Sequence, residues 1–136
     1  MAEGRRFVLD TSAVLALRGD EAGAGRVEDI LRAAAARKAA VFLSFMTRME
    51  MLYRISSEEG EEAASSAVRL LESTRIEWVS CEPEILVEAA RIKARGGLSV
   101  ADAWIAATAT VRDAVLVHAD PEFVPLRQVR QERLRG

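Results

Sequence analysis

Four short apolar runs are spaced along the chain, separated by longer segments with a different pattern. The runs do not alternate cleanly between apolar and polar residues, which is typical of strands covered on both faces. Three of the separating segments, residues 24–38, 46–57 and 83–95, carry apolar residues at helical spacing. The expected strands are "RRFVL" at 5–9, "AVFLS" at 40–44, "IEWVS" at 76–80 and "AVLVHA" at 114–119.

A strand followed by one or two helices, several times over, predicts right-handed crossovers and a parallel sheet. The expected fold is therefore a three-layer α/β/α domain with a mostly parallel central sheet. A chain of 136 residues is long enough for one domain and too short for two, so we expect a single domain over 1–136. Residues 125–136 stay open as an edge strand, a helix or a basic tail.

Composition is ordinary for a globular protein, with 50% apolar and 29% charged residues. No run approaches the roughly 20 apolar residues of a membrane span, and "MAEGRRF" leads into a strand rather than a signal-peptide core. These features predict a cytoplasmic protein with no membrane partner. The single Cys81 cannot form an internal disulfide.

The net charge of −2 gives no general attraction to nucleic acid, although the last ten residues form a basic patch. Of the 19 basic residues only two are lysines, and guanidinium groups suit phosphate contacts. The arginine content fits either RNA binding or the base composition of the coding genome. The patch contains Arg127, Arg130, Arg133 and Arg135 against one Glu132.

Two aspartates directly follow predicted strands. Asp10 comes after the first run and Asp120 after the fourth. Ligands of parallel sheets bind at the carboxyl ends of the strands, so both carboxylates are expected at one edge. Each also has a structural interpretation, because "DTSAVLAL" resembles a capped helix start and Asp120 precedes Pro121.

Two further acids lie within predicted helices. Asp102 follows Ser99 by three residues, a capping-box spacing, yet its helix is apolar nearly all round. A carboxylate in the first turn of such a buried helix needs a cation or hydrogen-bond donors. Glu50 is the sole acid in an apolar turn, and an exposed ion pair with Arg54 is its simplest role.

Together the four acids suggest a metal site. Clustered carboxylates repel one another by roughly 1 to 4 kcal/mol per pair at surface-like dielectric, so they hold either protons or a cation. An all-oxygen site suits Mg²⁺ or Mn²⁺ rather than zinc. Such ions support phosphodiester hydrolysis. No Ser-His-Asp or Cys-His constellation is visible in the sequence.

The segments that contain these acids resemble the motif blocks of a known family. In order and spacing, "FVLDTSAVLAL", "SFMTRMEMLYRI", "LSVADAWIAATA" and "VHADPEF" are similar to those of PIN-domain ribonucleases, and the small size resembles VapC-type toxins of toxin-antitoxin pairs. The resemblance covers residues 6 to about 124. It implies a Mg²⁺- or Mn²⁺-dependent endoribonuclease that cleaves RNA, a small antitoxin that covers the site, and a homodimer. It further implies that Asp10, Glu50, Asp102 and Asp120 form the acidic metal site, with Ser12 and Thr11 supporting it.

The chain departs from the family pattern at two positions. His118 stands where a Thr or Ser is common, and it either contacts RNA or a carboxylate of the site, or is structural. Glu122 replaces a second aspartate, which leaves the number of metal ions open. Arg48, Arg54 or the basic tail would then hold the RNA backbone.

Two rival functions follow from the same residues. In a catalytically silent module the acids are helix caps, and the basic tail binds RNA or a protein. A signalling receiver domain shares the layered fold but needs a lysine near the last strand, and this chain has none beyond Lys93.

Overall fold

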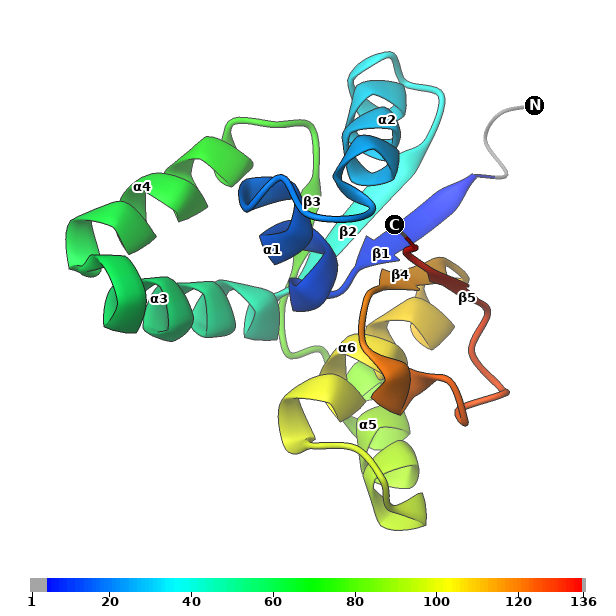
Figure 1. The fold of residues 1–136 in the computed structure, drawn as a ribbon. Helices are drawn as coiled ribbons and strands as arrows, with labels where there is room; N and C mark the ends of the chain where they lie inside the picture. Colours follow the sequence, from blue (N-terminus) through cyan, green and yellow to red (C-terminus); the bar gives the residue numbers. More distant parts are fainter. Residues whose placement is uncertain (1–4, 136) are drawn as a thin grey trace.

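A computed structural model describes residues 5–135 of the chain. Five strands form one sheet in the order β3-β2-β1-β4-β5, and all four neighbouring pairs are parallel (Figure 1). Each of the four predicted runs contains one strand, which confirms the parallel sheet. The strands are β1 (Arg6–Leu9), β2 (Ala40–Ser44), β3 (Glu77–Val79), β4 (Val115–His118) and β5 (Gln131–Arg133).

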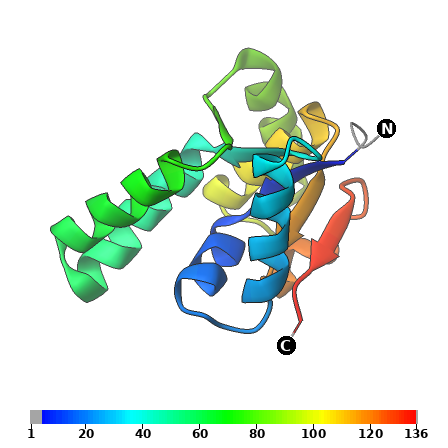
Figure 2. The same cartoon turned by 90° about the horizontal axis from the view of Figure 1, so that it is seen from above.

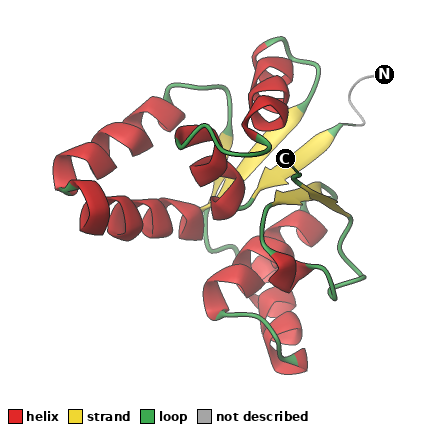
Figure 3. Cartoon of the chain, in the orientation of Figure 1, coloured by secondary structure: helices red, strands yellow, loops and turns green. Residues whose placement is uncertain are grey.

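Six α-helices and one short 3-10 turn, η2 (Pro121–Phe123), connect the strands (Figure 3). The three predicted helical segments correspond to α2, α3 and α5. The sequence did not resolve α4 as a separate helix, because two of its four buried residues are alanines, which give a weak apolar signal. The helices are α1 (Thr11–Arg18), α2 (Ala24–Ala35), α3 (Phe45–Glu59), α4 (Glu61–Glu72), α5 (Pro83–Arg95) and α6 (Val100–Val111).

Side chains of β1 alternate between two cores, one on each face of the sheet. Phe7 and Leu9 pack among residues of α1, α2, α3 and α4. Val8, between them, packs with residues of α5 and α6. Figure 1 shows α5 and α6 on one side of the sheet and α1 and α2 on the other. The predicted three-layer α/β/α arrangement is therefore confirmed.

Helices α3 and α4 form a hairpin that extends away from the sheet, as Figures 1 and 2 show. Gly60 joins the two helices with φ 98°, a left-handed backbone conformation that favours glycine. Met51 and Ile55 of α3 and Ala64 and Val68 of α4 belong to the first core. The first turn of α3 packs beside α1, where the hydroxyls of Thr11 and buried Thr47 are hydrogen-bonded.

The C-terminal segment closes the sheet rather than leaving it. Strand β5 pairs with β4, and the Arg26 guanidinium of α2 donates to both carboxylate oxygens of Glu132 at 2.6 and 3.0 Å. Gly23, at the start of α2, has φ +91°, and a Cβ there would lie 2.7 Å from the Cβ of Leu134. Residues 131–133 are thus an edge strand anchored to α2.

Candidate active site

The carboxyl ends of β1 and β4 lie side by side. Their register pairs Leu9 with Val117, and the Asp10 amide donates to the Val117 carbonyl at 2.9 Å. Asp10 and Asp120 therefore emerge at the same edge of the sheet, as the sequence predicted. Glu50 lies in the second turn of α3, which follows β2, and Asp102 lies in the first turn of α6.

Asp10 is almost fully buried, with 3% of its surface exposed. Its Oδ2 atom accepts hydrogen bonds from the amide and the hydroxyl of Ser12, so Asp10 does cap α1. Its Oδ1 atom is buried without a partner among residues 5–135. Burial raises the pKa of Asp10, against the lowering effect of the Ser12 hydrogen bonds. An unpartnered, desolvated carboxylate oxygen is stabilised by a proton or a cation.

The negative charges of the other three acids act on Asp102. Burial is the largest cause that raises its pKa to about 7, followed by the charges of Asp10, Asp120 and Glu50. Its amide donates to the Ser99 hydroxyl at 3.1 Å, so the predicted cap of α6 is present as well. A group whose charged form is disfavoured by burial and by like charges gains most from a nearby cation.

Glu50 is held by a hydroxyl rather than by an arginine. The Thr11 hydroxyl donates to Glu50 Oε1 at 2.7 Å and lies 3.1 Å from the Thr47 hydroxyl. The ion pair expected between Glu50 and Arg54 does not form, because the carboxylate turns toward α1 instead. Thr11 thus supports Glu50, and Thr47 is a further buried partner that no pattern in the sequence indicates.

Ser12 joins the two strand ends. Its hydroxyl donates to Asp10 and accepts from the Ala119 amide at 2.9 Å. Asp120 Oδ1 accepts from the Glu122 amide at 2.9 Å, which makes Asp120 the cap of η2. The Glu122 side chain is exposed at the same end of the sheet.

His118 is fully buried behind Asp120, so its ring is not placed to contact RNA. Its Nδ1 atom accepts from the Asp120 amide at 3.2 Å, and its Nε2 atom lies 2.9 Å from Gln131 Oε1. The Gln131 amide group donates to the carbonyls of Phe123 and Leu126 at 2.8 and 2.7 Å. With Nδ1 accepting, Nε2 carries the proton. His118 and Gln131 together fix the turn that contains Asp120, and no pattern in the sequence indicates this role of Gln131.

The arginines considered for RNA binding differ in their freedom. Arg48 donates to Glu72 at 2.7 Å and stacks over Trp78, with its guanidinium 4.3 Å from the ring centre, so it is occupied inside the protein. Arg130 pairs with Asp113 at 2.7 Å. Arg54 is exposed and makes no ion pair with any residue from 5 to 135.

The oxygen atoms of the four acids are the type of ligand that a hard cation such as Mg²⁺ prefers. They are carboxylate oxygens, one of them buried and unpartnered, that repel one another. As placed, however, no three His, Cys, Asp or Glu side chains within residues 5–135 are gathered closely enough to hold a metal ion. Binding a cation here therefore requires side-chain rotation of the less buried acids, Glu50, Asp102 and Asp120. No helix in this part of the chain is long and apolar enough to cross a membrane.

Comparison with known proteins places the chain among similar folds. The model of the PIN domain family matches residues 7–128. No curated protein sequence matches the chain. VapBC2 of Rickettsia felis, bound to promoter DNA, is a similar solved structure with TM-score 0.76 and 18% identity, covering 95% of this chain and 98% of that one.

Two further structures agree with this fold. DNA-bound VapBC of Salmonella typhimurium has TM-score 0.75 and 22% identity, covering 95% of this chain and 98% of that one. VapC20 of Mycobacterium tuberculosis, described as a toxin that cleaves the sarcin-ricin loop, has TM-score 0.71 and 18% identity, covering 96% and 99%. The family match over most of the chain and these likenesses of fold lead to one conclusion: this chain belongs to the PIN domain family.

Proposed function

We propose that the protein is a metal-dependent endoribonuclease, the toxin of a VapC-type toxin-antitoxin pair. The observation that carries the proposal is the buried Oδ1 atom of Asp10, which has no hydrogen-bond partner within residues 5–135. It belongs to a group of acids whose charges, together with burial, raise the pKa of Asp102 to about 7. Buried carboxylates without cations or donors destabilise a fold, and such groups are typical of sites that bind a ligand. Membership of the PIN domain family adds support.

The residues take distinct roles in this proposal. Asp10, Asp102 and Asp120 supply most of the contacts to Mg²⁺ or Mn²⁺, and Glu50 completes the site. The bound ion would polarise a water and neutralise charge on the scissile phosphodiester. Thr11 holds one oxygen of Glu50, which leaves the other free to orient the attacking water or to accept its proton.

Three residues would support this arrangement. Ser12 fixes Asp10 and, through the Ala119 amide, keeps the ends of β1 and β4 in register. His118 holds the turn of Asp120 from behind. Glu122 lies near enough to Asp120 in sequence to serve as an outer ligand of a second ion, as we expect from its place in the family pattern.

The partners belong to the same proposal. The similar structures include VapBC complexes and a toxin described as cleaving the sarcin-ricin loop. By analogy, the substrate of this chain is RNA, and a small antitoxin covers its site. We also propose that it acts as a homodimer in the cytoplasm. A small antitoxin gene directly upstream would support the pairing.

The decisive experiment is cleavage of labelled single-stranded RNA with Mn²⁺, with Mg²⁺ and with EDTA. Asp102→Asn should lower the metal-dependent rate by at least about 100-fold, beyond the loss typical of residues that only support metal ligands. Asp29→Asn, which removes the same charge from the exposed face of α2, should retain the wild-type rate. Equal rates in Asp102→Asn and wild type would overturn the assignment.

The alternative function, a catalytically silent binding module, also has support in the structure. Asp10 and Asp120 both act as caps, as a catalytically silent binding module requires. Such a module would show neither metal-dependent cleavage nor stabilisation by Mn²⁺. Both results together would therefore replace the nuclease by the binding module.

A further inference from the structure

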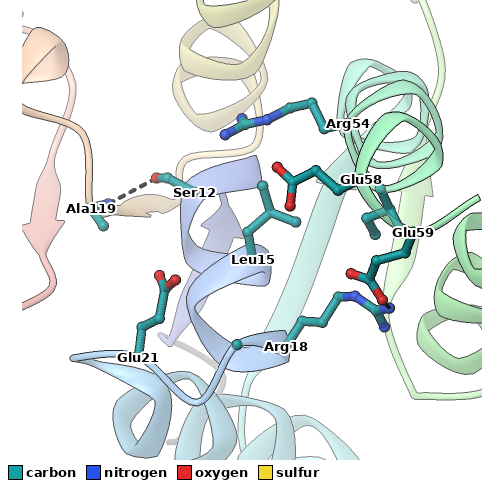
Figure 4. Close-up of a pocket in the computed structure, with 10 residues that line it drawn as sticks. Ser12, Leu15, Arg18, Glu21, Arg54, Glu58, Glu59 and Ala119 are labelled. Atoms are coloured by element: carbon teal, nitrogen blue, oxygen red, sulfur yellow. Dashed lines mark hydrogen bonds and ion pairs between the residues drawn. The ribbon is translucent and has the colours of Figure 1, made fainter.

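A cavity of about 590 Å³ adjoins the end of the acidic site that contains Asp10 and Asp120, through Ser12, which donates to Asp10, and Ala119, which precedes Asp120. Ser12 and Ala119 form the end that it shares with the acidic site, and Figure 4 shows the hydrogen bond between them. Helix α1 and the turn after it form one wall, and α3 forms the other. A polymer with its phosphodiester at the acids would therefore pass this cavity with the neighbouring nucleotide.

The lining combines an apolar surface with charged groups. Leu15 of α1 and Ile55 of α3 contribute apolar side chains. Arg18 and Glu59 pair with each other at 2.9 Å, so they neutralise one another. The charged side chains of the lining that are not in this ion pair determine which ligand the cavity can bind.

Three charged side chains in the lining have no ion-pair partner within residues 5–135. They are Glu21 in the turn after α1, and Arg54 and Glu58 on α3. In Figure 4 the Arg54 guanidinium and the Glu58 carboxylate both extend from α3 toward Ser12 and Leu15. The Glu21 side chain lies against Gly19, with its Oε2 atom 3.2 Å from the place of a Cβ there.

These groups specify the chemistry of a ligand. Ionised carboxylates only accept hydrogen bonds, so the ligand must present N–H donors. A guanidinium plane and aliphatic side chains suit a flat ring, as in the recognition of unstacked RNA bases. A basic side chain of a protein partner would also satisfy the carboxylates, but it would offer no flat surface to the Arg54 guanidinium or to the apolar side chains of Leu15 and Ile55. The observations therefore favour a nucleobase.

Among the four bases, guanine fits a carboxylate best. Its N1–H and N2–H₂ groups are adjacent donors on one edge and match the two oxygens of a carboxylate in a bidentate pair. Adenine, cytosine and uracil present one donor beside an acceptor on that edge. We infer that this cavity binds a guanine of the RNA, next to the cleaved bond, with Glu58 accepting from its Watson–Crick edge and Arg54 stacking on the ring. The inference rests on the proposed ribonuclease function.

Nucleoside monophosphates test this without any cleavage, because they contain no phosphodiester link to hydrolyse. Metal-free wild-type protein, labelled with ¹⁵N, is titrated with GMP, AMP and IMP and followed by NMR. GMP should shift the amides of Ser12, Gly19 and Ile55 and bind about tenfold more tightly than AMP, the lower part of the range for one bidentate pair. IMP, which lacks the exocyclic amine, should bind more weakly than GMP.

A specificity switch sharpens the test. Glu58→Gln replaces two acceptors by one acceptor and one donor, a pattern that pairs with adenine and no longer matches the two adjacent donors of guanine. The variant should lose the preference for GMP and gain affinity for AMP. Glu62→Gln, which makes the same charge change on the exposed part of α4, should leave the preference unchanged.

Several results would overturn the inference. These are equal affinity for GMP and AMP, shifts confined to amides outside the cavity, or no shifts at millimolar GMP. Shifts of the same amides by arginine amide but not by GMP would assign the cavity to a basic side chain of a partner. Because no metal or RNA is present, the outcome is independent of whether the chain is a nuclease. Conversely, metal-dependent cleavage without preference for sites beside guanine would leave the nuclease standing and remove the guanine site.

Discussion

Charged residues are arranged in opposite ways in two regions of this molecule. Around the outside of the sheet, cations meet anions: Arg26 pairs with Glu132, and Arg112 with Glu82. At the carboxyl ends of β1 and β4, carboxylates meet carboxylates, and the charges of its neighbours help raise the pKa of Asp102. Asp102 has no ion-pair partner within residues 5–135, although the chain contains 19 basic residues.

The two arrangements have opposite effects on stability: paired charges stabilise the fold, and clustered carboxylates destabilise it. The hydrogen bond from Arg26 lowers the pKa of Glu132, so ionisation of Glu132 favours folding. Burial and like charges raise the pKa of Asp102, so its ionisation opposes folding. A group that opposes folding is expected where a ligand uses it, and this contrast yields measurable differences in stability.

The largest expected effect comes from adding a metal ion. At about 100 times its Kd, Mn²⁺ should stabilise the folded state by about 2.7 kcal/mol. For a domain of this size that raises Tm by about 8 °C. Asp102→Asn should show less than half of this rise in thermal unfolding, whereas Asp29→Asn should show all of it. An equal rise in Asp102→Asn would mean that the ion binds elsewhere.

The second effect appears without metal. Because the pKa of Asp102 is about 7 in the folded chain against an ordinary 3.8, the folded state holds more protons between these values. The free energy of unfolding of the wild type therefore falls as pH rises from about 4 to 7, because the Asp102 carboxyl loses its proton in the folded state. In EDTA, Asp102→Asn should have a Tm about 3–6 °C above wild type at about pH 8.

The pH series supplies its own control. Near pH 4 the Asp102 carboxyl is protonated in the folded chain and partly protonated in the unfolded one, so wild type and variant should unfold at nearly the same temperature. A variant that is less stable than wild type at about pH 8 would show that Asp102 is a stabilising residue. The contrast between the two regions would then disappear.

Much of the sheet and the acid positions was predictable because parallel strands are covered on both faces. Such strands are continuous apolar runs, and a charged residue directly after a run lies at the carboxyl end of that strand. Asp10 and Asp120 were placed in this way. The apolar surroundings of Asp102 and Glu50 suggested that these acids join them, and the family resemblance supported the grouping, because sequence spacing alone does not show which helix turns lie near a given strand end.

Other features depend on tertiary contacts that leave no local pattern. Thr47 is an ordinary helix residue until α3 packs beside α1 and brings its hydroxyl to Thr11. Gln131 lies in a basic, weakly apolar segment, and its role appears only when β5 pairs with β4 and reaches His118. The i,i+4 spacing of Glu50 and Arg54 favoured an ion pair, but the Thr11 hydroxyl competes successfully for the carboxylate.

The smallest effect tests the outer region and should have the opposite sign to that of Asp102. Glu132→Gln removes the charge that Arg26 stabilises and should lower stability by about 1 kcal/mol near pH 7, a modest value because the pair is partly exposed. The lowered pKa of Glu132 means that its contribution is present above the ordinary value of 4.5 and is lost as pH falls through the folded value. Variant and wild type should therefore converge in acid, whereas at about pH 8 Glu132→Gln destabilises and Asp102→Asn stabilises.

A matched control separates this pair from surface charge in general. Glu28 pairs with Arg32 one turn away on the exposed face of α2, so Glu28→Gln should change stability by only about 0.3–0.5 kcal/mol. Chemical unfolding of the three variants and the wild type at several pH values gives both sign and size. If Glu132→Gln and Asp102→Asn shifted stability in the same direction at about pH 8, charge reduction alone would explain both. The difference between the two regions would then reflect net charge and not the local arrangement of partners.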